Sequence, residues 1–294
     1  MRNFIILFEE KEGTSALVRL LDNFKQISIV HQVGGRSWEP FDRNTCGWLR
    51  ISELTRCFDL IFDENPLDLD RLNGIYAKKA RAPLDAMDKS GSVGFKMRVV
   101  PPNPIERIWL GFMNGLSRTL TRKDFSRSFE RTMIKTSKAN NLMVFFAVRQ
   151  DVFRWALSKY HGDGTGKPGH IQFKLASGSI SQSEIGKIYV DPDAFEKVVQ
   201  ACEASHANKR RLMGEFQAAG IPVHPLRYED FLIDKQRYFT RVLELLEIDI
   251  SYAELESALE LGSNFKKVHS DDISDFVENH EEVTEIFGER YVAW

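Results

Sequence analysis

Cysteine is scarce in this chain of 294 residues, and net charge is almost absent. The three cysteines, Cys46, Cys57 and Cys202, have neither the even number of a disulfide framework nor the spacing of a metal site, which indicates the reducing cytoplasm. A net charge of −2 gives no overall attraction to nucleic acid or to anionic membranes. No apolar run approaches the roughly 20 residues of a spanning helix. A strand begins within three residues of the first position, so we expect neither a transmembrane segment nor a signal peptide.

Short apolar runs rich in β-branched and aromatic residues alternate with longer amphipathic stretches along the chain. Such alternation predicts an α/β protein with three layers, α/β/α, a central mostly parallel sheet and helical insertions. Hydrophobic residues make up 43% of the chain, enough for the core of a single domain over 1–294. The predicted strands are 4–8, 26–31, 92–100, 141–149 and 221–227, the last at a sheet edge because it holds two prolines.

The remaining segments are predicted to be helices and one long loop. We expect a helical insert at about 45–90, a Gly/Ser-rich loop at about 161–187 and a helical tail at about 251–294. Apolar spacing and Pro or Gly boundaries predict further helices over 104–138, 150–160, 192–220 and 228–246.

The stretch Phe4–Arg19 combines a strand, a glycine turn, two hydroxyl residues and the start of an amphipathic helix. In this order the N–H groups of the first helical turn point out from the carboxyl end of the strand, and the helix dipole adds partial positive charge. Gly13 lets the backbone approach a phosphate, Lys11 adds a cation, and Thr14 and Ser15 add hydroxyl donors. The pattern predicts a P-loop-like anion site, with an ordinary capped βα turn as the alternative.

A second glycine-rich loop follows the predicted strand 26–31 and carries Glu39. Open α/β sheets build their sites at such strand ends. Glu39 precedes Pro40, so we expect it to be extended, either as a functional carboxylate or as a solvated loop acid. His31 at the strand end is either a structural hydrogen-bonding group or a reserve base.

Two basic residues belong to other predicted strands. Arg149 ends the strand 141–149 and can either fork two donors onto a phosphate or pair with Asp151 at the surface. Lys96 inside 92–100 is either an edge residue or a functional cation.

Five segments in this order resemble motifs of the PAPS-dependent sulfotransferases, and within them the bacterial Stf0-like type; PAPS is 3′-phosphoadenosine-5′-phosphosulfate. The first four are similar to the family's 5′-phosphosulfate loop, its acid-plus-aromatic segment, its GxK strand and its 3′-phosphate segment. Together the five cover most of the chain. They are Lys11-Glu12-Gly13-Thr14-Ser15, Trp38-Glu39-Pro40-Phe41, Val93-Gly94-Phe95-Lys96, Arg149 to Ser158, and Tyr189-Val190-Asp191-Pro192 with the later Leu226-Arg227-Tyr228-Glu229-Asp230-Phe231.

The resemblance implies sulfuryl transfer from PAPS to a hydroxyl of a carbohydrate, glycolipid or other small acceptor, which leaves the product PAP and needs no metal. It also implies two catalytic residues, Glu39 as the general base and Lys11 as the cation at the leaving group. Residues implied to bind the nucleotide are Lys11, Glu12, Gly13, Thr14, Ser15, Arg149, Ser158, Phe265, Lys266 and Lys267.

The anion loop departs from the family pattern because it contains Glu9, Glu10 and Glu12. These carboxylates would repel a polyanion unless they point outwards or pair with Lys and Arg. A catalytically silent nucleotide-binding or interaction protein is therefore one alternative. A P-loop kinase using ATP is another, although the loop lacks G-x-x-x-x-G-K-[ST]. The sequence is compatible with a homo-oligomer and does not identify the acceptor.

Overall fold

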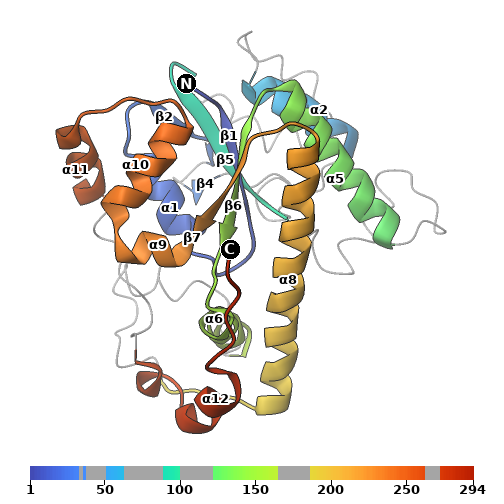
Figure 1. The fold of residues 1–294 in the computed structure, drawn as a ribbon, viewed down its shortest axis with the longest axis vertical. Helices are drawn as coiled ribbons and strands as arrows, with labels where there is room; N and C mark the ends of the chain where they lie inside the picture. The colour runs from blue at the N-terminus through green and yellow to red at the C-terminus, as the bar shows by residue number, and fades with distance from the viewer. Residues whose placement is uncertain (33–35, 38–50, 63–88, 100–121, 165–185, 262–271) are drawn as a thin grey trace.

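The computed structural model describes residues 1–32, 36–37, 51–62, 89–99, 122–164, 186–261 and 272–294. Within them, five parallel strands form one sheet in the order β2-β5-β1-β6-β7 (Figure 1). This sheet confirms the predicted α/β class, and β7 is at the predicted edge. The strands are β1 (Phe4–Phe8), β2 (Ile27–Ile29), β5 (Ser92–Arg98), β6 (Met143–Val148) and β7 (Val223–Arg227).

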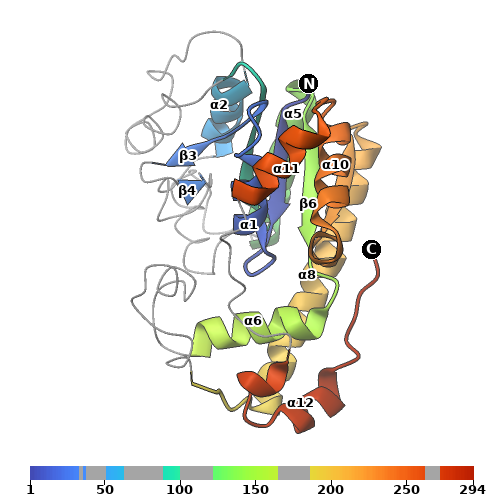
Figure 2. The ribbon, with the colours of Figure 1, turned by 90° about the vertical axis from the view of Figure 1, so that its left-hand side faces the viewer.

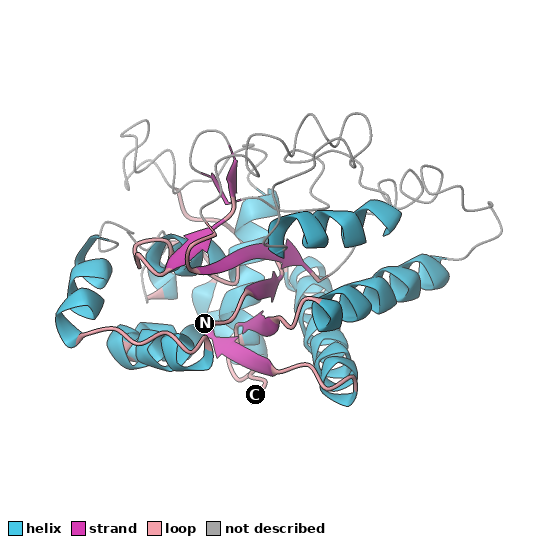
Figure 3. Ribbon diagram, turned by 90° about the horizontal axis from the view of Figure 1, so that it is seen from above, coloured by secondary structure: helices cyan, strands magenta, loops and turns pink. Residues whose placement is uncertain are grey.

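Different helices cover the two faces of the sheet, as the view from above shows (Figure 3). Successive side chains of a strand point to opposite faces. Ile5 and Leu7 therefore pack in one hydrophobic cluster, and Phe4 and Ile6 in the other. Burial on both faces explains why β1 and β6 are continuous apolar runs. The helices are α2 (Ile51–Phe62), α5 (Arg122–Ala139) and α8 (Pro192–Ala218) on the first face, and α1 (Thr14–Leu21), α10 (Lys235–Leu245) and α11 (Tyr252–Leu261) on the second.

A third hydrophobic cluster lies beyond the carboxyl ends of the strands, where α6 (Val152–Gly164) and α12 (His280–Phe287) pack against α8 (Figure 2). The 27 residues of α8 extend over about 40 Å, so one helix contacts both the sheet and this cluster. Asp191 caps its N-terminus by accepting a hydrogen bond from Ala194 N at 3.0 Å.

Several predicted boundaries are wrong. The helix predicted over 228–246 is two helices, α9 (Tyr228–Ile233) and α10, because Asp234 adopts an extended conformation and caps α10 through the N–H of Arg237. The strand predicted over 26–31 ends at Ile29. His31 belongs to β3 (His31–Gln32), which pairs with β4 (Arg36–Ser37) in a separate two-stranded sheet.

Two further boundaries differ near the carboxyl edge and in the tail. Helix α6 continues to Gly164, into the predicted Gly/Ser-rich loop. The tail helix α12 follows a 3-10 turn, Ile273–Asp275. In the described part of the chain, no helix combines the length and apolarity needed to cross a bilayer.

Candidate anion-binding site

The loop between β1 and α1 has the backbone expected of an anion site. Lys11 and Gly13 both adopt left-handed conformations, with φ of 67° and 76°. Gly13 is the N-cap of α1 and makes no side-chain cap, and the helix's own hydrogen bonds begin with Ala16 N and Leu17 N donating to Gly13 O. The N–H groups of Thr14 and Ser15 therefore precede the helical ladder at its positive end. No acidic residue stands in the first turn of α1.

Gly13 is required here for a second reason. A β-carbon added to it would lie 2.5 Å from the ring of Tyr228, which opens α9. The left-handed φ and the ring together exclude any other residue at this position. Tyr228, which we predicted only as part of a structural helix start, thus forms one wall of the loop.

All three acids of the loop have basic partners from other elements. Glu9 lies 3.6 Å from Lys159 Nζ of α6 and accepts a hydrogen bond from Ser205 of α8. Glu10 pairs with Arg98 at the end of β5 at 2.7 Å. Each of the three carboxylates is therefore next to a cation. Pairing with Lys or Arg is the condition under which these acids would not repel a polyanion bound at the loop.

Glu12 forms the most deeply buried of these pairs. Its side chain and that of Lys209 are both fully buried and form an ion pair, and Glu12 Oε2 accepts the N–H of Glu9 at 2.6 Å. Burial raises the pKa of Glu12 to about 7, against the opposing effect of Lys209. Lys209 also donates to Ala147 O of β6 at 2.8 Å. Glu12 therefore faces the interior, and its contacts fix the shape of the loop.

Trp155 of α6 holds the loop from the same side. It is fully buried and its Nε1 donates to Glu10 O at 2.8 Å. The ammonium groups of Lys159 and Lys209 lie 5.0 and 5.5 Å from its ring. Lys209 occupies a position in the buried stripe of α8. A lysine on an apolar stripe is the one local signal that could have identified this contact from sequence.

Lys11 and Ser15, by contrast, are exposed, and Lys96 points to the same loop. Lys96 Nζ lies 3.4 Å from Ser15 Oγ and 4.8 Å from the centre of the Phe8 ring. Its strand, β5, lies between β2 and β1, with the β2 pairing ending at Gly94, and the Lys96 side chain is buried, which contradicts a residue that snorkels to solvent at a sheet edge. Two lysines thus flank the positive end of α1.

Arg149 lies beside the loop, as the predicted phosphate-binding role requires. Its Nη1 donates to Lys11 O at 3.3 Å, and its guanidinium stacks 5.0 Å from the Tyr228 ring. Asp151 does not pair with it in the way the surface alternative predicts. Instead, Asp151 accepts the N–H of Arg154 at 2.8 Å and lies 3.5 Å from the Arg154 guanidinium. Ser158 is half-buried, two turns into α6.

The N-terminus of α6 is already occupied by protein. Arg290 O accepts the N–H groups of Val152 and Phe153 at 3.0 and 3.3 Å. Of these two helices, α1 is the one whose first two N–H groups, those of Thr14 and Ser15, have no protein acceptor among the described residues.

Four predicted site residues, Glu39, Phe265, Lys266 and Lys267, lie outside the described residues, so their roles stay predictions. The backbone of His31 belongs to the small β3–β4 sheet.

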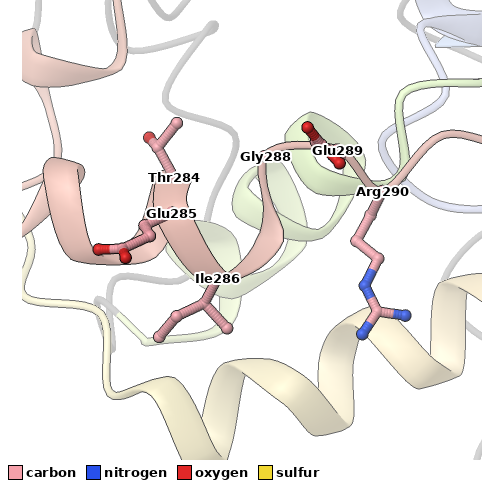
Figure 4. A pocket seen from close by; sticks show the side chains of 6 residues that line it. All are labelled: Thr284, Glu285, Ile286, Gly288, Glu289 and Arg290. Atoms are coloured by element: carbon pink, nitrogen blue, oxygen red, sulfur yellow. The ribbon is translucent and has the colours of Figure 1, made fainter.

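A hollow in the described part of the chain lies away from this loop. It has a volume of about 680 Å³ and lies beside α12, between Thr284 and Arg290 (Figure 4). Glu285 and Glu289 line it, which makes it unsuitable for an anion. Among the described residues no group of His, Cys, Asp or Glu is arranged to hold a metal.

No family model and no curated protein matches the chain. Solved structures similar to it include a sulfotransferase from Mycobacterium avium, with 12% identity, a TM-score of 0.43 and coverage of 98% of this chain and 75% of that one. A mouse sulfotransferase complexed with PAP has 13% identity, a TM-score of 0.40 and coverage of 97% and 83%. A sulfotransferase from Alicyclobacillus acidocaldarius has 16% identity, a TM-score of 0.40 and coverage of 98% and 92%. At these scores the likenesses carry no argument, and the α/β class follows from the sheet of this chain itself.

Proposed function

We propose that the protein is a PAPS-dependent sulfotransferase whose nucleotide site is the β1–α1 loop together with Arg149. One observation carries the proposal: Arg149 and Lys11 are joined by a hydrogen bond beside the positive end of α1. A nucleotide with phosphate groups on both its 5′ and 3′ positions needs two separate anion sites close together. The motif resemblance assigns the 5′-phosphosulfate to the loop and the 3′-phosphate to Arg149 and Ser158.

The residues present suit this anion chemistry. Main-chain N–H groups, the Ser15 hydroxyl and the Lys96 ammonium group lie at the end of α1, and the exposed Lys11 belongs to the same loop. These are the donors that a phosphosulfate accepts from. Thr14 is buried, so we assign its main chain and not its hydroxyl to the anion. In this proposal Glu12 does not bind the anion; its buried contacts fix the shape of the loop.

In the proposed reaction, bound PAPS supplies the sulfuryl group. Glu39 takes the proton of the acceptor hydroxyl, whose oxygen forms the new S–O bond. As the S–O bond to the 5′-phosphate breaks, its electron pair stays on the phosphate oxygen, and Lys11 stabilises the growing charge. Lys96 adds a second cation within reach of Ser15. The products are a sulfate ester and PAP, with the proton on Glu39.

Calorimetric titration with PAP, ADP and magnesium-ATP tests the proposal directly. We expect micromolar or tighter binding of PAP and much weaker binding of the other two. Tight magnesium-dependent binding of ATP would instead support the kinase alternative, and absence of PAP binding would refute the proposal. The Arg149→Ala variant should lose about 10- to 100-fold in PAP affinity. Arg154→Ala removes an equal charge from the same segment and should change it little.

Glu39→Gln tests the base separately. This variant should bind PAP normally and lose turnover once an acceptor is found, because the amide cannot take a proton. Unchanged turnover would remove Glu39 from the mechanism and leave the nucleotide site intact.

A further inference from the structure

The segment Arg290–Trp294 runs alongside the connection from β6 to α6. Val292 N donates to Gln150 O at 2.9 Å, Tyr291 forms an isolated antiparallel β-bridge with Asp151, and Arg290 O caps α6. Figure 1 shows this segment leaving α12, passing α6 and ending beside β7. We call these five residues the strap. The strap contacts the main chain on the carboxyl side of Arg149, the residue assigned to the 3′-phosphate.

A chain of two hydrogen bonds connects the strap to Arg149 itself. Trp294 Nε1 lies 2.7 Å from His206 Nδ1, and His206 Nε2 lies 3.0 Å from Arg149 O. An indole N–H can only donate, so Nδ1 is the acceptor and the proton of the neutral imidazole is on Nε2. Nε2–H therefore donates to the Arg149 carbonyl. The indole of Trp294 selects the one neutral tautomer that can make this bond.

The surroundings of His206 keep it neutral. It is buried in α8 beside Trp155, and burial together with the charge of Lys209 lowers the pKa of His206 to about 4. An imidazole protonated on both nitrogens could not accept from Trp294. The Trp294 ring is held in turn by Arg210, whose guanidinium lies 5.2 Å away and donates to Ala293 O.

Arg149 is thus fixed at both ends. His206 donates a hydrogen bond to its carbonyl oxygen, while its guanidinium donates to Lys11 O and stacks on the Tyr228 ring. If the imidazole adopted the other tautomer, the Nε2 lone pair would face the Arg149 carbonyl oxygen, and the repulsion between them would displace Arg149.

We propose that Trp294 and His206 are positioning residues that set the recognition of a 3′-phosphate through the main chain of Arg149. This inference rests on the proposed function. It adds that nucleotide specificity depends on a strap that follows Arg149 by well over a hundred residues in the sequence.

The test compares PAP with AMP, which differ only in the 3′-phosphate. Trp294→Phe keeps an aromatic ring beside Arg210 and His206 but removes the N–H donor. We expect this variant to bind PAP about 3- to 10-fold more weakly and AMP as the wild type does. Val292→Ala is the matched control: it trims the strap's packing and leaves both hydrogen bonds, so its PAP-to-AMP ratio should be that of the wild type.

Nitrogen-15 NMR of the imidazole supplies a readout that a purely structural role would not move. His206 should show the Nε2–H tautomer in the wild type and in Val292→Ala, and a mixture of tautomers in Trp294→Phe. A wild type that prefers PAP, with an unchanged ratio in Trp294→Phe, would overturn the role of the strap alone. A wild type that binds PAP and AMP equally would overturn the proposed function, and the inference with it.

Discussion

Lys11 has a left-handed backbone conformation, which residues other than glycine usually avoid. Its φ of 67° costs on the order of 1 kcal/mol, and the conformation is retained because Arg149 holds Lys11 O while Trp155 holds Glu10 O. An anion-binding role would explain why the strained conformation is kept at a residue that carries an exposed cation near a helix N-terminus.

Two substitutions separate the charge of Lys11 from its strain. Lys11→Ala and Lys11→Gly should both weaken PAP binding about tenfold, because both remove the ammonium group. The glycine variant should be the more stable of the two by about 1 kcal/mol, because glycine adopts left-handed φ without cost. Urea unfolding and calorimetry measure the two effects. An alanine variant at least as stable as the glycine variant would contradict the assigned strain.

Glu12 should make stability depend on pH in a definite direction. Its pKa rises from 4.5 in the unfolded chain to about 7 in the fold, so the folded state binds the proton more tightly. Such a group stabilises the fold most below pH 4.5, and this contribution is lost as the pH rises to about 7.

The comparison that isolates this effect is wild type against Glu12→Gln. The unfolding free energy of the wild type should fall relative to the variant between pH 4.5 and 7, by up to about 3 kcal/mol. Glu10→Gln removes an exposed carboxylate from the same loop and controls for the loss of charge. A constant difference between wild type and Glu12→Gln across this window would show that burial does not raise the Glu12 pKa.

At the scale of elements, α8 is the support of the anion loop. Lys209→Met should cost about 3–5 kcal/mol of unfolding free energy at neutral pH, because Glu12 loses its cationic partner in a buried ion pair. In the double variant Glu12→Gln/Lys209→Met the loss should be smaller than the sum of the single losses by at least 1 kcal/mol.

Chemical denaturation of all four proteins measures this coupling. Lys197→Met changes an exposed lysine of the same helix and should be within about 0.5 kcal/mol of the wild type. Additive losses at Glu12 and Lys209 would mean that α8 does not support the loop through this pair.

The elements themselves follow largely from local pattern. Met143–Val148 is a short continuous apolar run rich in β-branched and aromatic residues, and such a run is typical of a strand buried on both faces. The break at Asp234 was missed because the apolar spacing continues through it, while the capping bond to Arg237 N depends on one backbone angle. Lys96 shows the same limit, since whether a strand is central depends on pairing order and not on its own residues.

The acids of the anion loop illustrate why the site could be predicted only in part. Lys11, Gly13 and Arg149 were predicted from their place after strands. The partners Lys159, Lys209 and Arg98 are 88 to 197 residues away from the acids in sequence, and no spacing rule connects positions so distant. The Tyr228 ring above Gly13 is unpredictable for the same reason.

At the scale of the whole molecule, three segments distant in sequence meet at the carboxyl edge of the sheet. These are the β1–α1 loop, the β6–α6 connection and the strap, and each contacts the next through main-chain oxygens: Arg149 to Lys11, and the strap to Gln150 and α6. A ligand that engages both anion sites should therefore stabilise all three together, whereas a ligand for the loop alone should not.

Hydrogen exchange with and without PAP tests this joint response. At 100 times its dissociation constant PAP should stabilise the fold by about 2.7 kcal/mol, with slower exchange in residues 9–17, 149–158 and 290–294 and little change in α11. Saturating AMP, which lacks the 3′-phosphate, should protect 9–17 and leave the other two segments as they are in the free protein. Protection confined to α12 and the hollow beside it would contradict the assigned site, because it would place the bound ligand in that hollow. Glu285 and Glu289 line the hollow, so we expect no phosphate to bind there. Protection of all three segments by PAP and of one by AMP would show that the 3′-phosphate couples the strap to the loop.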